Sequence, residues 1–155
     1  MKFFLFSLYN IVLALWVGGV FLFTFIATPT IFRAFGRDAA GDIVGRLFPG
    51  YFLYNLVLAS VALVLFLLLI SDRSALAARL SLSLLIAAFI VNAYATFLLH
   101  PQMQQVKQTI ATFEKESESS ARKKFRALHA VSAVLNLLHL GGGVALLVAS
   151  PLLKK

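Results

Sequence analysis

The stretch FFLFSLYNIVLALWVGGVFLFTFIATPTIF, residues 3–32, decides the fold because it contains no charged residue. A helix needs about 20 mostly apolar residues to cross the hydrocarbon core of a bilayer, which is about 30 Å thick. Three further apolar stretches meet this requirement, at about 50–70, 80–99 and 127–149. The sequence therefore predicts four membrane-spanning helices.

The composition supports this prediction. Of the 155 residues, 61% are hydrophobic and 13% are charged, which is too apolar for a soluble domain of this size. The long apolar runs lack the alternation of barrel strands. We therefore predict an all-α integral membrane four-helix bundle that forms one domain over residues 1–155. Because no cleavage site follows the first span, it is predicted to be retained. The absence of cysteine excludes disulfides and thiolate metal sites.

The basic residues lie near the ends of the spans and do not form one stripe, so a phospholipid surface is the predicted partner and nucleic acid is not. Four spans place both termini and the connection 71–78 on one face. That face carries five Lys and Arg residues and the opposite face carries nine. The positive-inside rule predicts that the face with nine is cytoplasmic and that both termini are outside.

The connections between spans are also patterned. Residues 33–52, RAFGRDAAGDIVGRLFPGYF, predict a short interfacial helix that places Arg37 and Arg46 at lipid phosphates and turns Phe48 inward. After Pro101 the third helix is predicted to continue as a cytoplasmic extension, with a break near 116–120. Ser119 or Ser120 would then cap the fourth helix.

Each span contains one asparagine, and an amide that faced lipid would leave its donors and acceptors unpaired. Three of the four are predicted to lie roughly 8 to 14 Å below the cytoplasmic edge, at about 1.5 Å per residue. These three are predicted to meet in one polar layer with Tyr51. The fourth, Asn10, falls on the far side of the bundle. His100 and His129 would lie at the rim above the layer and His139 one turn below it. The residues of the layer are Tyr51, Asn55, Asn92 and Asn136.

This layer has two explanations. Amide hydrogen bonds between membrane helices contribute about 0.6 kcal/mol each on average, so the asparagines are explained well by helix packing alone. An imidazole inside the membrane must instead be neutral and hydrogen-bonded or must bind something. His129 and His139 are therefore the candidate metal ligands, for haem iron or copper. The candidate ligand-binding residues are Trp16, Tyr51, Asn55, Asn92, His100, His129, Asn136 and His139.

No catalytic residue is predicted, because the chain has no Ser-His-Asp set, no phosphate loop and no acid within a span.

Three segments together resemble a family of membrane proteins. They are LWVGGVFLFTFIATPTIF (15–32), AAGDIVGRLFPGYF (39–52) and LHAVSAVLNL (128–137). They are similar to the bacterial and eukaryotic four-helix membrane proteins typified by the transmembrane protein associated with cisplatin resistance. The positions that its motifs mark here are Trp16, Pro29, Phe48, Pro49, Asn92, Pro101, His129 and Asn136.

That family is similar in helical plan to copper-resistance-protein-D-like membrane proteins, which include a haem-containing protoporphyrinogen oxidase. The wider resemblance implies haem or copper as a cofactor. Tyr9 stands where the oxidase has a histidine in its first span.

Three functional hypotheses remain open at this point. In the first, the polar layer binds a small ligand, haem or a metal ion, or takes part in solute export and resistance. In the second, the chain is a structural subunit that associates with a membrane partner protein or with copies of itself. The third is a haem-dependent oxidoreductase. The expected location is a bacterial inner membrane.

Overall fold

The computed structural model describes residues 2–70, 76–112 and 119–154, and it describes no side chain for residue 154. The regular structure in these ranges is helical throughout. The helices are α1 (Lys2–Phe21), η1 (Leu22–Ala27), α2 (Thr28–Ala34), α3 (Arg37–Leu69), α4 (Leu76–Tyr94), η2 (Ala95–Leu99), α5 (His100–Gln108), α6 (Ser120–Ala149) and η3 (Ser150–Lys154).

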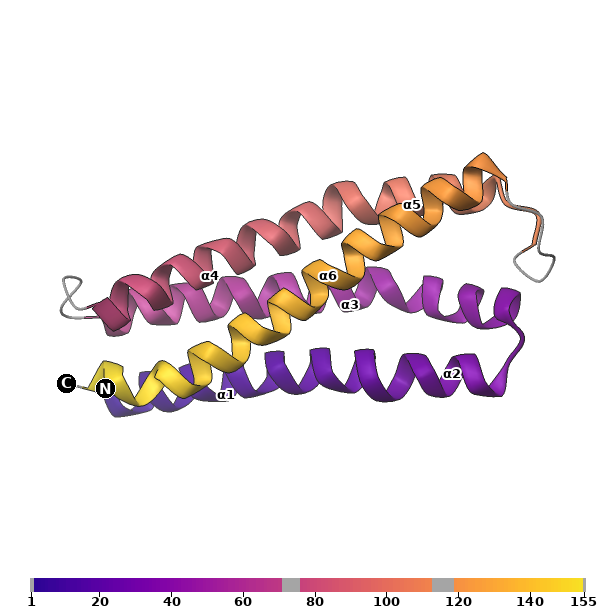
Figure 1. Cartoon of the computed structure of the whole chain (residues 1–155). Helices are drawn as coiled ribbons and strands as arrows, with labels where there is room; N and C mark the ends of the chain where they lie inside the picture. Colours follow the sequence, from indigo (N-terminus) through magenta and orange to yellow (C-terminus); the bar gives the residue numbers. More distant parts are fainter. Residues whose placement is uncertain (1, 71–75, 113–118, 155) are drawn as a thin grey trace.

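Consecutive helices join into four rods that are long and apolar enough to cross a membrane: Lys2–Ala34, Arg37–Leu69, Leu76–Gln108 and Ser120–Leu153. This confirms the predicted all-α four-helix bundle. A rod of 33 residues is about 50 Å long, which exceeds the hydrocarbon thickness of about 30 Å. Both termini lie at one end of the bundle (Figure 1), the terminal end. The opposite end, which holds residues 35–36 and 109–112, is called the loop end.

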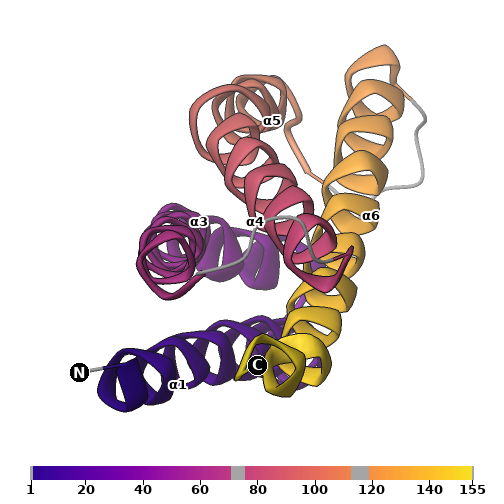
Figure 2. The same ribbon diagram turned by 90° about the vertical axis from the view of Figure 1, so that its left-hand side faces the viewer.

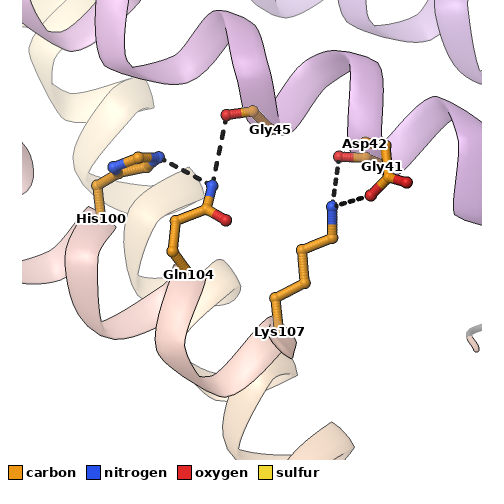
Figure 3. Close-up of polar contacts among 6 residues, drawn as sticks. All are labelled: Gly41, Asp42, Gly45, His100, Gln104 and Lys107. Carbon is orange, nitrogen blue, oxygen red and sulfur yellow. Dashed lines mark hydrogen bonds and ion pairs between the residues drawn. The ribbon is translucent and has the colours of Figure 1, made fainter. Parts of the chain in front are cut away.

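The predicted interfacial helix is not a separate element. Residues 38–46 form the first part of α3, which continues through Pro49 to Leu69 without a break. Two side chains of α5 bind backbone carbonyls in this part of α3 and keep it in line with the rest of the helix. Lys107 Nζ donates to Gly41 O at 2.9 Å, and Gln104 Nε2 donates to Gly45 O at 3.4 Å (Figure 3). The predicted inward position of Phe48 is confirmed, because its ring contacts Phe23 and Phe52.

Two wide π-helical turns have a common cause in the sequence. Proline lacks an N–H and its ring clashes with the carbonyl four residues earlier, so a helix must adjust before it. Segment η1 precedes Pro29, and η2 precedes Pro101. In each, a backbone N–H bonds a carbonyl five residues back, from Thr28 to Phe23 and from His100 to Ala95. The prolines thus widen the first and third rods.

The polar segment after the third span is helical beyond Pro101 as predicted, but the helix ends before the predicted break, because residues 109–112 are not helical. Helix α5 extends the third rod to Gln108, and the side chain of Ser119 accepts a hydrogen bond from Arg122 N at 3.3 Å. Ser119 is therefore the cap of α6. The predicted break near 116–120 falls largely on residues 113–118, outside the described residues.

Helix α6 crosses the bundle at an incline (Figures 1 and 2). It packs against α1, α4 and α5, whereas α2 packs against α3. The buried residues of α6 are His139, Gly143 and Leu146, all in its C-terminal half. Neither η1 nor α2 has a buried residue. The first and fourth rods are therefore packed together at the terminal end and diverge toward the loop end.

Candidate functional site

The predicted polar layer exists. Its four members line one small cavity of about 20 Å³ between α3, α4 and α6. His139, which was predicted to lie one turn lower, lines the same cavity. The prediction was wrong for His139 because it assumed parallel helices, whereas α6 is inclined. A cavity of this size holds about one water molecule. Its polar lining residues are Tyr51, Asn55, Asn92, Ser132, Asn136 and His139.

One side of the layer is a hydrogen-bonded trio from three rods. The Tyr51 hydroxyl donates to Asn136 Oδ1, and Asn136 Nδ2 donates to Thr24 Oγ1 at 2.7 Å. The trio joins η1, α3 and α6 at the depth where the rods begin to separate. Thr24 was not among the residues predicted from the sequence. Its signal was that Thr24 is the only polar residue in 21–27, just before Pro29.

The other side of the layer is packed tightly. Asn92 Nδ2 donates to Ala88 O at 2.8 Å and lies 3.1 Å from each ring nitrogen of His139. The imidazole of His139 also contacts the ring of Trp16, with ring centroids 4.3 Å apart and an interplanar angle of 31°. Gly143 permits this approach, since a Cβ there would lie 2.8 Å from Val17 Cγ2. His139 and Trp16 are thus parts of the core.

Asn55 is the member of the layer with a free acceptor. Its amide Nδ2 donates to Tyr51 O at 3.0 Å, while its Oδ1 is buried and has no protein partner among the described residues. A water molecule in the small cavity could donate to this oxygen, which is the usual way a buried amide is satisfied. The small cavity therefore suits a water molecule.

The two remaining polar predictions lie away from the layer. His100 Nε2 is 3.1 Å from Gln104 Nε2, and its ring contacts Phe48 and Phe52. Asn10 lies at the terminal end as predicted, where its Oδ1 accepts from Ser150 Oγ at 2.7 Å.

Two larger cavities adjoin the layer between the first and fourth rods. One, of about 330 Å³, is lined by η1, α2, α3 and α6 and shares Tyr51, Ser132 and Asn136 with the small cavity. The other, of about 450 Å³, continues toward the loop end and is lined by α2, α3, α5 and α6. Both are lined by Thr28, Phe48 and His129. We call the two together the lateral cleft.

His129 lies where the two parts of the lateral cleft meet. Its ring stacks on Phe125, with centroids 6.2 Å apart. Among the described residues its imidazole has no hydrogen-bond partner. His129 and Asn136 line the same cavity. His129 therefore offers a free donor and acceptor to a molecule in the cleft.

The predicted arginines differ in position. Arg37, the first residue of α3, lines the loop-end part of the cleft. Arg46 is exposed and lies nine residues further along the same helix. Nine residues correspond to about 900°, so the two side chains leave α3 on opposite faces.

The geometry does not fit haem at His139 or a metal ion shared by His129 and His139. His139 faces a cavity of about 20 Å³, which cannot take a porphyrin. His129 is ten residues away on the same helix, about 15 Å along the axis, so the two imidazoles cannot meet at one ion. The described residues include no group of three or more His, Cys, Asp or Glu that could hold a metal.

A comparison with protein-family models places the chain. The model described as a domain of unknown function, DUF4149, matches residues 11–112. The chain belongs to this family. A search of the curated proteins and a search of the solved structures gave no match. The resemblance to the cisplatin-resistance-associated and copper-resistance-D-like proteins therefore stays a prediction.

The DUF4149 match divides the candidate site. It includes Thr24, Tyr51, Asn55 and Asn92, which come from the first three rods. It ends before α6, which supplies His129, Ser132 and Asn136. The chain is thus a membrane protein of the DUF4149 family whose cleft has one wall outside the matched residues.

Proposed function

We propose that this DUF4149 protein binds a small amphiphilic molecule in the lateral cleft. The observation that carries the proposal is a cavity of about 330 Å³ with an aromatic wall and a few hydrogen-bonding groups at its base. Binding sites for small molecules commonly have this composition and begin at about 300 Å³. The hydrogen-bonding groups are His129, Ser132 and the trio of Thr24, Tyr51 and Asn136.

The polar groups differ in whether they already have a hydrogen-bond partner in the protein. The side chains of the trio are already joined by two hydrogen bonds, so they form a fixed polar base. His129 has no such partner in the described chain. A ligand with a hydroxyl, amide or acid group would therefore bond His129, while its apolar part lies against Phe23 and Phe48.

The ligand enters from the bilayer. Helix α6 has no buried residue from 120 to 138, and the exposed side chains of this part include Val131, Val134 and Leu137. Such a surface faces acyl chains in an integral membrane protein. A lateral opening between α2 and α6 gives an amphiphile access without crossing water. The resemblance to the cisplatin-resistance-associated family suggests that the bound molecule is then exported.

The proposal includes an orientation. We propose that the loop end faces the cytoplasm of a bacterial inner membrane and that both termini are outside, because the loop-end face carries nine Lys and Arg residues against five. Reporter fusions at the C-terminus decide this. A cytoplasmic signal there would reverse the orientation and leave the cleft unchanged.

The test fills the cleft. Ala133 lines the cavity of about 330 Å³, so Ala133→Trp should exclude a ligand. Ala130→Trp is the matched control, since Ala130 is exposed on the same helix and lines neither part of the cleft. Each protein is purified in detergent, and native mass spectrometry measures the fraction that carries a bound small molecule.

We expect Ala133→Trp to carry at least about tenfold less bound molecule, which is about 1.4 kcal/mol, with Ala130→Trp unchanged. Equal occupancy in the two variants, or an empty parent protein, would show that the cleft is not a binding site. A stoichiometric partner protein in place of a small molecule would favour the structural-subunit hypothesis.

A further inference from the structure

We infer that the molecule bound in the lateral cleft is an anionic phospholipid of the surrounding leaflet. Its phosphate would lie between Arg37 and Lys107 at the loop end, and one acyl chain would extend along the cleft toward Tyr51. This inference rests on the proposed function and names the ligand of the same site.

The loop-end part of the cleft combines two cations with an aromatic wall. Arg37 and Lys107 line the cavity of about 450 Å³ together with Phe32, Phe48 and Phe125. Phospholipids have the same two parts, a charged phosphate and apolar chains. A soluble anion would make no apolar contact with the aromatic wall. An uncharged apolar molecule would leave both cations without an anionic partner.

Lys107 already makes two hydrogen bonds within the protein. Its Nζ donates to Gly41 O at 2.9 Å and to Asp42 Oδ1 at 2.7 Å (Figure 3). An ammonium has three donors, so one remains for a ligand. The Asp42 carboxylate, whose side chain is 69% exposed, offsets most of the charge of Lys107. Lys107 therefore contributes a hydrogen bond more than a net charge.

Arg37 supplies the net positive charge. Its side chain is exposed, and in the described part of the chain it has no hydrogen-bond or ion-pair partner. The planar guanidinium presents five donors in a fork that matches phosphate oxygens. Arg37 is therefore the group that should distinguish an anionic headgroup from a zwitterionic one.

The length of the cleft agrees with a lipid chain. Fourteen residues separate Arg37 from Tyr51 on α3, which is about 21 Å along the helix. Half of the bilayer, including the headgroup region that holds the phosphates, is about 20 to 22 Å thick. A phosphate at Arg37 thus places an acyl chain within its own leaflet with the trio near its end.

The test measures which lipid is retained. The protein is reconstituted in nanodiscs with equal amounts of phosphatidylglycerol and phosphatidylcholine that carry the same acyl chains. It is then extracted into detergent, and mass spectrometry gives the ratio of the two retained lipids. Parent protein, Arg37→Gln and Arg33→Gln are compared. Arg33 is the matched control because it is an exposed arginine at the same end of the bundle that lines neither part of the cleft.

The parent should be enriched in phosphatidylglycerol, and Arg37→Gln should lower that enrichment about fivefold, the effect of about one basic residue at a membrane surface. Arg33→Gln should leave the ratio unchanged. An unaltered ratio in Arg37→Gln, or an equal loss in both variants, would overturn the inference. Displacement of the lipid by inorganic phosphate alone would also overturn it, because the site would then recognise a free anion.

The Ala133→Trp variant separates the two proposals. If it expels both lipids and Arg37→Gln does not change their ratio, the cleft binds an amphiphile and the anionic assignment is wrong. If Ala133→Trp retains both lipids in full, the proposed function is wrong, and so is the placement of the acyl chain.

Discussion

The two halves of α6 are built differently. In the C-terminal half, His139, Gly143 and Leu146 are buried against α1 and α4. In the N-terminal half, no residue of 120–138 is buried, and the lateral cleft separates it from α2. Both halves are equally helical, because backbone hydrogen bonds must be satisfied in lipid whether or not a helix has neighbours.

This difference shows where packing stabilises the fold. Lipid tails are as apolar as leucine, so membrane helices associate only where side chains interlock or hydrogen-bond. Near the middle of the rods small residues permit that contact: a Cβ at Gly19 would lie 2.5 Å from Tyr54 Cε1, and one at Gly143 would lie 2.8 Å from Val17 Cγ2. The loop end lacks such interlocking between the first and fourth rods. Binding surfaces commonly come from the less stable part of a fold.

The largest effect should be the difference between two aliphatic residues of α6, one in each half. Leu146 is 1% exposed and Val134 is 57% exposed. Leu146→Ala should lower the free energy of unfolding by about 2 to 5 kcal/mol, since it leaves a cavity in the core. Val134→Ala should change it by less than about 0.5 kcal/mol. Reversible unfolding in mixed micelles measures both. Similar losses would contradict the comparison, because the two halves would then be packed alike.

A smaller effect is expected from two adjacent glycines. A Cβ at Gly143 would press on the stiff side chain of Val17, whereas one at Gly142 has no neighbour within 4 Å. Gly143→Ala should therefore cost about 1 to 3 kcal/mol of stability. Gly142→Ala should raise stability by up to about 1 kcal/mol, because alanine favours the helix. The same unfolding assay gives the two values, and a gain in both would show that the rods are not in close contact there.

Much of this structure is predictable from local sequence. Apolar length gave the four rods, and Ser119 gave the cap of α6. The cost of burying amides gave the layer of Tyr51, Asn55, Asn92 and Asn136. The rods, the cap and the polar layer each follow from a residue type, its neighbours along the chain, and whether the residue faces lipid or protein.

The errors come from contacts between distant segments. The continuity of α3 through Pro49 depends on Lys107 and Gln104 of α5. The depth of His139 and the position of the cleft depend on the incline of α6, which residue counting along parallel helices cannot reveal. Thr24 was missed because its partner, Asn136, lies 112 positions away.

The smallest expected effect concerns the boundary between the two halves, where the trio joins η1, α3 and α6. Tyr51→Phe removes the hydroxyl that donates to Asn136 and leaves the ring that stacks on Phe23, with centroids 4.2 Å apart. A hydrogen bond between membrane helices contributes about 0.6 kcal/mol on average, so the loss of stability should be about that size. Tyr94→Phe is the matched control, since Tyr94 is 40% exposed and its hydroxyl has no partner in the described chain.

The same variants can be compared at one position of the cleft. A single cysteine at Ala133, in a chain that has none, should react faster with a membrane-permeant maleimide in Tyr51→Phe than in the parent. The trio limits how far α6 can move from η1, and without it the cleft should open more often. Unchanged reactivity in Tyr51→Phe, or an equal increase in Tyr94→Phe, would mean that the trio does not control the width of the cleft.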